Sequence, residues 1–147
     1  MKAAVKQLMK LADSLCRERG VRFTQQRKTV LQIISENQHP ITAYEILETL
    51  QQQNPGIAPP TIYRALEFLQ QQGFIHKLET QHSFVSCQHP EHDHMSQFLI
   101  CSDCGDVTEI EDTSISNSLQ KATRETGFTP RRRVVEVIGV CAECTRN

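Results

Sequence analysis

Four of the six cysteines form two closely spaced pairs, Cys101-x2-Cys104 and Cys141-x2-Cys144, which are separated by 36 residues. Two residues between cysteines allow both sulfurs to face one ion, while the backbone amides between them stabilise thiolate charge. Four sulfurs leave no open coordination position, so the pattern predicts a structural Zn²⁺ site. An iron–sulfur cluster is the second interpretation and a redox dithiol is the third.

A second group of candidate ligands lies in a predicted hairpin. We expect strands over residues 74–79 and 83–87, joined by a two-residue turn at 81–82. On that register His76 and Cys87 are directly opposite, with Cβ atoms about 5 Å apart. An imidazole nitrogen and a thiolate at that separation can bind one ion.

The segment after the hairpin, residues 88–94, adds further imidazoles and carboxylates, and Glu109 offers another oxygen donor. A mixed site drawn from a hairpin, a hinge and a second domain would couple metal occupancy to domain orientation. The alternative is that this segment is a solvated loop and Cys87 is a small buried hydrophobic residue. The pairing of Cys87 with His76 favours the metal site.

Apolar periodicity predicts four helices ahead of the hairpin. The first ends at Gly20, Thr24 caps the second, and a capping box at Thr42 and Glu45 starts the third. Pro59-Pro60 opens the fourth helix, because proline needs no amide partner in the first turn. Three helices followed by a hairpin predict a winged helix-turn-helix, here with an extra helix in front.

The outer face of the fourth helix presents Thr61, Tyr63, Arg64 and Glu67. Arginine can bond guanine O6 and N7 together in the major groove, so this face suits DNA. The alternative is that Arg64 is a solvated charge and Tyr63 packs at the rim of the domain.

The second half alternates strands with one helix. We expect strands over 98–101 and 107–110, a helix that starts at Asp112 or Thr113 and ends at Gly127, and a strand over 134–140. This order indicates a small α/β domain around the cysteines.

Charge changes sign between the halves, with a net +3 over residues 1–86 and −4 over 87–147. A basic half joined to an acidic half is typical of a nucleic-acid-binding module attached to a different domain. We therefore predict an α+β protein: a winged-helix DNA-binding domain over 1–84, a hinge over 85–90, and an α/β dimerisation and metal-binding domain over 91–147.

Several function classes are disfavoured. No segment is typical of a signal peptide, and no apolar run approaches the ~20 residues of a membrane span, which predicts a soluble, intracellular protein. An enzyme is not expected, because a catalytic metal needs an open position and a general base. Outside the two groups of ligands, Cys16 is expected to be a buried thiol and His39 to be exposed.

Nearly the whole sequence resembles the ferric uptake regulator family. Its members are cytoplasmic homodimeric repressors that bind palindromic operators when their sensing metal is present. The resemblance implies double-stranded DNA and a second copy of the chain as partners, with no membrane and no small-molecule substrate. It rests on Arg22-Phe23-Thr24-Gln25-Gln26-Arg27, Ala43-Tyr44-Glu45-Ile46-Leu47, Pro60-Thr61-Ile62-Tyr63-Arg64-Ala65-Leu66, Gly73-Phe74-Ile75-His76-Lys77, Ile100-Cys101-x2-Cys104-Gly105-x-Val107-x-Glu109, and Gly127-Phe128 to Glu136-x2-Gly139-x-Cys141.

Within the family the sequence is most similar to the zinc sensors. Iron sensors usually carry His-His-x-His immediately before the first cysteine pair, whereas here six residues separate His94 from Cys101. A cysteine, Cys87, holds the sensing position, and thiolate favours zinc over Fe²⁺. The resemblance implies two zinc ions per chain, with the sensing ion bound by His76, Cys87, His94 and Glu109. His92 or His89 are alternatives to His94. Many iron-type members have a histidine three residues before the strand glutamate, where this sequence has Arg133, so we do not predict the third metal site of those members.

The resemblance carries DNA contacts over to Tyr44 and Arg64, with Tyr63 and Thr61 near the groove. We therefore expect a repressor that binds its operator when zinc fills the sensing site and that controls zinc uptake genes. The alternatives are an Fe²⁺ or peroxide sensor of the same family, a zinc enzyme, or a zinc-buffering or chaperone protein.

Overall fold

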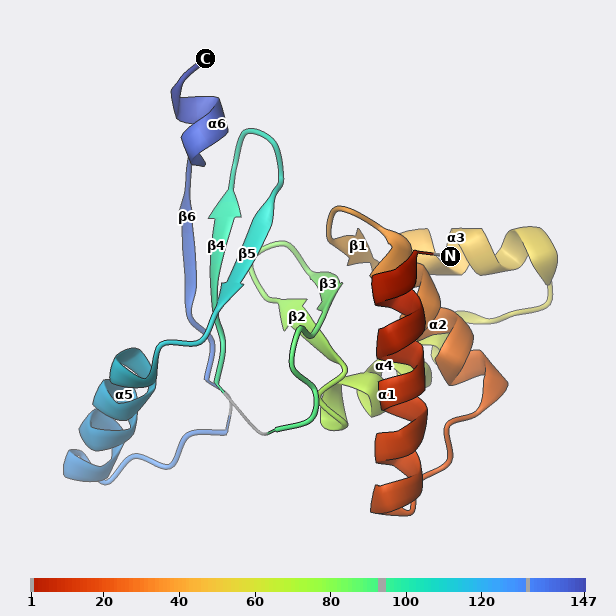
Figure 1. Ribbon diagram of the computed structural model, residues 1–147, viewed down its shortest axis with the longest axis horizontal. Coiled ribbons are helices and arrows are strands. Elements are labelled where there is room, and N and C mark those ends of the chain that lie inside the picture. Colours follow the sequence, from red (N-terminus) through yellow and green to blue (C-terminus); the bar gives the residue numbers. More distant parts are fainter. Residues whose placement is uncertain (1, 93–94, 132) are drawn as a thin grey trace. The chain divides into compact units, whose positions relative to one another are not determined.

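The computed structural model describes residues 2–92, 95–131 and 133–147 (Figure 1). The chain divides into two compact units, Met1–Asp93 and His94–Asn147. The first contains α1 (Ala3–Arg19), α2 (Gln25–Glu36), β1 (Ile41–Thr42), α3 (Ala43–Gln53), α4 (Pro59–Gln71), β2 (Ile75–Leu78) and β3 (Ser83–Ser86). The second contains β4 (Gln97–Cys101), β5 (Val107–Ile110), α5 (Thr113–Glu125), β6 (Glu136–Gly139) and α6 (Ala142–Thr145).

Helices α2, α3 and α4 begin where the sequence predicts. The Thr24 hydroxyl accepts a hydrogen bond from the Arg27 amide at the start of α2. The Thr42 hydroxyl accepts from the Glu45 amide at 3.2 Å and donates to the Glu45 carboxylate at 3.0 Å. Pro59 and Pro60 occupy the first turn of α4. The two threonine caps each satisfy an amide that has no partner inside its helix, and the two prolines have no amide that needs one.

One apolar face of α4 forms much of the core of this unit. It buries Ile62, Ala65, Leu66, Phe68 and Leu69, and it packs against α2, α3 and β2. Burying each large apolar side chain contributes about 1.5–3 kcal/mol. A small sheet of order β1-β3-β2 completes the winged-helix fold. The core therefore fixes which face of α4 points outward.

The register of the hairpin differs from the prediction. His76 pairs with Val85 and Leu78 with Ser83, so the loop has four residues, 79–82, and not two. The Cys87 amide donates to the Phe74 carbonyl at 2.8 Å, which places Cys87 opposite Phe74. The predicted direct opposition of His76 and Cys87 is wrong. The two residues are instead diagonal neighbours on one face of the hairpin.

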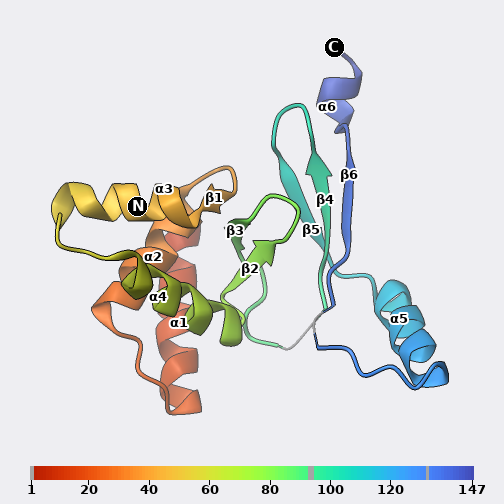
Figure 2. The same cartoon turned by 180° about the vertical axis from the view of Figure 1, so that it is seen from behind.

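The second unit has a three-stranded sheet of order β5-β4-β6, with β4 in the middle (Figure 2). β4 is antiparallel to β5 and parallel to β6, with Cys101 paired to Gly139. Parallel strands end at the same edge of a sheet. The strand pairing therefore brings the residues that follow β4 and β6 together.

The helix of this unit, α5, starts at an Asp112 cap, as predicted. The Asp112 carboxylate accepts from the amides of Ser114 and Ile115 at 2.8 and 3.3 Å. The buried Gln97 side chain ties the cap to β4, since its carbonyl oxygen accepts from the Asp112 amide at 2.9 Å.

Neither α5 nor β6 buries a residue within a single copy of the chain. Large apolar side chains remain exposed on this unit: Leu99, Leu119, Phe128, Val134, Val137, Ile138 and Val140. So many exposed apolar side chains on a small unit are typical of an association surface. Among the described residues, no helix combines the length and the apolar character needed to cross a membrane.

Candidate metal centres and recognition helix

The two cysteine pairs meet at the edge where β4 and β6 end. The ligand atoms of Cys101, Cys104, Cys141 and Cys144 all lie within 4.8 Å of one another, and the sulfurs of Cys104 and Cys141 are 3.7 Å apart. Tetrahedral zinc with Zn–S bonds of about 2.3 Å places its sulfurs about 3.8 Å apart. The geometry of this four-cysteine cluster therefore fits a closed zinc site.

Hydrogen bonding makes the four thiols unequal. The Cys101 sulfur accepts from the amides of Cys104 and Cys141, at 3.5 and 3.3 Å, and these bonds lower the pKa of Cys101 to about 6. A hydrogen bond from Asp106 lowers the pKa of Cys104, but Cys101 and burial outweigh it and the net shift is upward. Hydrogen bonding to Cys141 raises the pKa of Cys144. The Cys101 thiolate is stabilised by the backbone, whereas the thiols of Cys104 and Cys144 need a cation to ionise beside it.

The second pair of predicted ligands lies within the first unit. The ligand atoms of His76 and Cys87 are within 4.8 Å of each other. Cys87 is only 2% exposed, and its sulfur accepts from the His89 amide at 3.4 Å. The structure therefore brings these two side chains together through the diagonal of the hairpin.

The other two predicted sensing ligands belong to the second unit. Glu109 is partly buried in β5, where it pairs with Phe98 of β4. His94 lies outside the described residues. The four-residue sensing set therefore stays a prediction.

A third cluster was not predicted as a separate group. The ligand atoms of His89, Glu91 and His92 lie within 4.8 Å of one another. A hydrogen bond from its own backbone amide, with smaller effects of His92 and His89, lowers the pKa of the Glu91 carboxyl. The His-rich composition of segment 88–94 was visible in the sequence, but which side chains share one side of the loop was not.

Arg19 is a further structural residue that the sequence did not single out. It extends from the end of α1 and donates to the Gln72 carbonyl at 2.7 Å and to the Pro90 carbonyl at 3.2 Å. Its guanidinium also lies 5.7 Å from the centre of the Phe74 ring. Arg19 therefore connects the end of α4 to the segment that carries His89.

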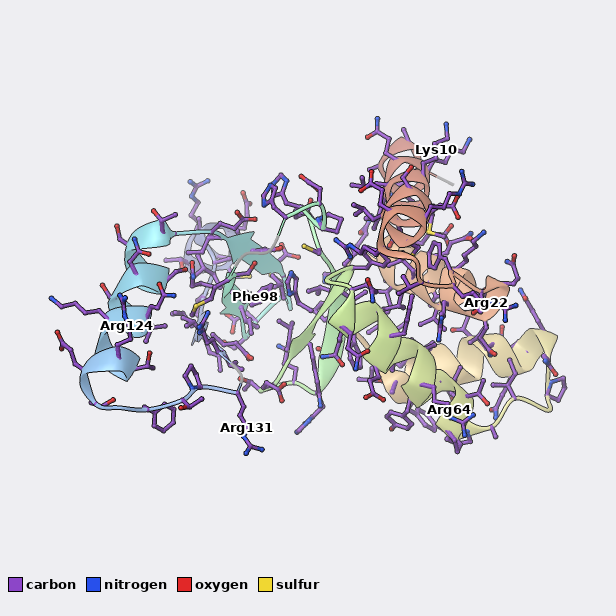
Figure 3. The ribbon with its side chains drawn as sticks, turned by 90° about the horizontal axis from the view of Figure 1, so that it is seen from below. Lys10, Arg22, Arg64, Phe98, Arg124 and Arg131 are labelled. Carbon is purple, nitrogen blue, oxygen red and sulfur yellow. The ribbon has the colours of Figure 1, made fainter. Side chains whose placement is uncertain are left out.

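The outer face of α4 is available for recognition. Tyr63 is 60% exposed, Arg64 is exposed and Thr61 is partly exposed. Arg64 points away from the core of its unit (Figure 3). Tyr44 of α3 is 67% exposed. These four side chains are the predicted DNA contacts, and all reach solvent.

Fold and sites together define the class: a winged-helix protein with metal-ligand clusters rich in cysteine and histidine. The model of the ferric uptake regulator family matches residues 18–138. The chain belongs to this family.

Individual relatives are more specific. The chain is 38% identical over 144 residues to the zinc uptake regulation protein of Escherichia coli (strain K12), covering 97% of this chain and 84% of that protein. It is 28% identical over 144 residues to the peroxide operon regulator of Bacillus subtilis (strain 168), covering 94% of each.

Solved structures of relatives also match nearly the whole chain. A zinc uptake regulator complexed with zinc and DNA matches with a TM-score of 0.93 at 37% identity, over 99% of this chain and 97% of that chain. Holo XcZur matches with a TM-score of 0.89 at 39% identity, over 96% of this chain and 99% of that chain.

Proposed function

We propose that this protein is a cytoplasmic, zinc-responsive transcriptional repressor and not an enzyme. As a homodimer it binds palindromic operator DNA when its sensing site holds zinc, and it controls zinc uptake genes. The similarity to the zinc uptake regulation protein of Escherichia coli and to a zinc uptake regulator complexed with zinc and DNA supports this function.

The choice of zinc as the sensed metal rests on one observation: the buried Cys87 thiol lies beside the His76 imidazole. Soft thiolate ligands select zinc over Fe²⁺ among the available metals, whereas iron sensing suits nitrogen and oxygen ligands. An Fe²⁺ or peroxide sensor of the same family has less support for this reason.

We assign two zinc ions to each chain. The four-cysteine cluster holds a permanent structural ion, since four sulfurs close its coordination sphere. His76, Cys87, His94 and Glu109 hold the sensing ion. Two of these ligands precede the boundary between the units and two follow it, so zinc would connect the units.

In this mechanism zinc acts through its differential affinity for the DNA-binding arrangement. Moving a two-state equilibrium from 1:99 to 99:1 needs about 5.5 kcal/mol of such preference. The arrangement places the recognition helices of two chains one DNA turn apart, about 34 Å. The exposed apolar side chains around β6 support pairing of two copies.

Replacing Cys87 with serine tests the sensing site. DNA selected from random duplexes by the zinc-loaded protein serves as operator, and binding of chelated protein is measured with added Zn²⁺ or Fe²⁺. Cys87→Ser should lose zinc-dependent binding while it remains a folded dimer. Cys16→Ala, which removes a different buried thiol, should retain the zinc response.

Normal zinc dependence in Cys87→Ser would refute the sensing assignment. If Fe²⁺ but not Zn²⁺ restored operator binding to the chelated, unsubstituted protein, the choice of zinc as the sensed metal would be refuted.

A further inference from the structure

We propose that His89, Glu91 and His92 form a third, exchangeable site for a divalent transition cation, with Zn²⁺ as the ion that fits it. This site shares no ligand with the four-cysteine cluster or with the His76 and Cys87 pair. Its three side chains lie within four consecutive positions, 89–92, of the segment that follows β3.

The distances within the cluster match those around a metal ion. One Glu91 carboxylate oxygen lies 3.4 Å from His89 Nδ1 and 3.5 Å from His92 Nε2. Nitrogen and oxygen ligands about 2.1 Å from a tetrahedral zinc ion are about 3.4 Å apart. The two rings are nearly parallel, with an interplanar angle of 10° and centroids 5.8 Å apart. Both imidazoles therefore reach the same carboxylate from positions that suit coordination.

The backbone holds this segment in place on the first unit. The His89 amide is bonded to the Cys87 sulfur, and the carbonyl of the buried Pro90 accepts from Arg19. Proline also fixes its own backbone and restricts His89 to extended conformations. A site on a restrained segment loses less conformational entropy when it binds than a site on a free loop.

The exposure of the three side chains sets the kind of site. Their exposed fractions are 55% for His89, 41% for Glu91 and 56% for His92. Three protein ligands leave at least one position for water, and solvent can reach the ion directly. We therefore expect the ion to bind more weakly here than at the four-cysteine cluster and to exchange faster with solution.

The test compares two double variants of the full chain, each with two histidines removed. His89→Gln with His92→Gln removes the proposed ligands, and His39→Gln with His82→Asn removes two exposed histidines elsewhere. Each protein is first loaded with two equivalents of zinc and then titrated with more, while NMR follows the histidine ring nitrogens and calorimetry follows binding.

The unsubstituted protein and the control should bind one additional equivalent, with the His89 and His92 signals shifting together and saturating. The ligand variant should bind that equivalent at least tenfold more weakly. Equal binding by both double variants, or shifts that continue beyond one equivalent, would show adventitious surface binding and overturn the site. The measurement does not involve DNA and rests only on the proposed count of two zinc ions in the other sites. If the sensing site held no zinc, the His89 and His92 signals would already shift within the first two equivalents, which distinguishes that failure from failure of this site.

Discussion

Zinc affinity of the four-cysteine cluster should depend on pH less steeply than four ordinary thiols would. Metal binding displaces thiol protons, and each displaced proton contributes a factor of ten in affinity per pH unit. Four thiols with an unperturbed pKa of about 8.5 would release about four protons at pH 7. The cluster differs because its thiols are not equivalent.

The pKa values in the cluster set the number of protons that zinc binding is expected to release. The pKa of Cys101 is about 6, so this thiol is roughly nine-tenths ionised at pH 7 and releases about 0.1 proton. The pKa values of Cys104 and Cys144 are raised, so each thiol still carries its proton. With Cys141 contributing at most one proton, the total is between about two and about three. Affinity should therefore rise about 100- to 1,000-fold per pH unit near pH 7.

The sign follows from the direction of the shifts. A depressed pKa makes the Cys101 thiolate available above about pH 6, and protonation removes it as the pH falls through that value. The slope should therefore increase by about one below pH 6.

Competition with a chromophoric chelator, corrected for the chelator's own protonation, measures the slope. Using the Cys87→Ser variant removes the proposed sensing site from the titration. A slope near four at pH 7 would mean that Cys101 is protonated, and a slope below two would mean that Cys104 or Cys144 is already ionised. Either result would refute the reasoning.

Three further substitutions test other parts of the structure. Thr42→Ala removes the cap of α3 and should cost about 1 kcal/mol in urea denaturation; an unchanged midpoint would show that the cap is not stabilising. Arg64→Ala should cost about 1–3 kcal/mol on the preferred operator and relax base preference in competition binding, whereas an equal loss on every sequence would indicate a phosphate contact only. Ile138→Glu places a charge on the exposed apolar face of β6 and should shift the dimer to monomer in sedimentation. The exposed substitution Lys10→Glu should leave the dimer intact, and a stable Ile138→Glu dimer would argue for another interface.

Helix boundaries were predictable because local chemistry fixes them. Thr24, Thr42 and Asp112 each cap a helix through a side chain that reaches the next turn, so a few residues contain the whole signal. The cysteine cluster was predictable for a similar reason, since each pair is a local turn. That the two pairs meet depends on the parallel pairing of β4 with β6, which spacing alone does not specify.

The hairpin register was not predictable in the same way. The loop over residues 79–82 contains no glycine or asparagine, the residues that mark two-residue turns. Within this loop His82 is the one residue with a positive φ, 50°. Four-residue loops have weaker sequence signatures, so the predicted register was shifted by two. A shift of two keeps side chains on the same face, which is why His76 and Cys87 still meet. The segment that contains His89, Glu91 and His92 is bonded at the Pro90 carbonyl to Arg19, 71 positions away, and local sequence does not indicate so distant a contact.

Because β4 and β6 end side by side, a metal ion at their ends also restricts the unfolded chain. A metal ion bound to Cys101 and Cys141 is a cross-link between positions 40 residues apart, and the enclosed loop contains all of α5. Treated as a covalent bridge of that span, the cross-link would remove about 4 kcal/mol of loop entropy from the unfolded state. Helix α5 buries no residue within a single copy of the chain, so the cross-link would keep it tethered at both ends without any packing of its own.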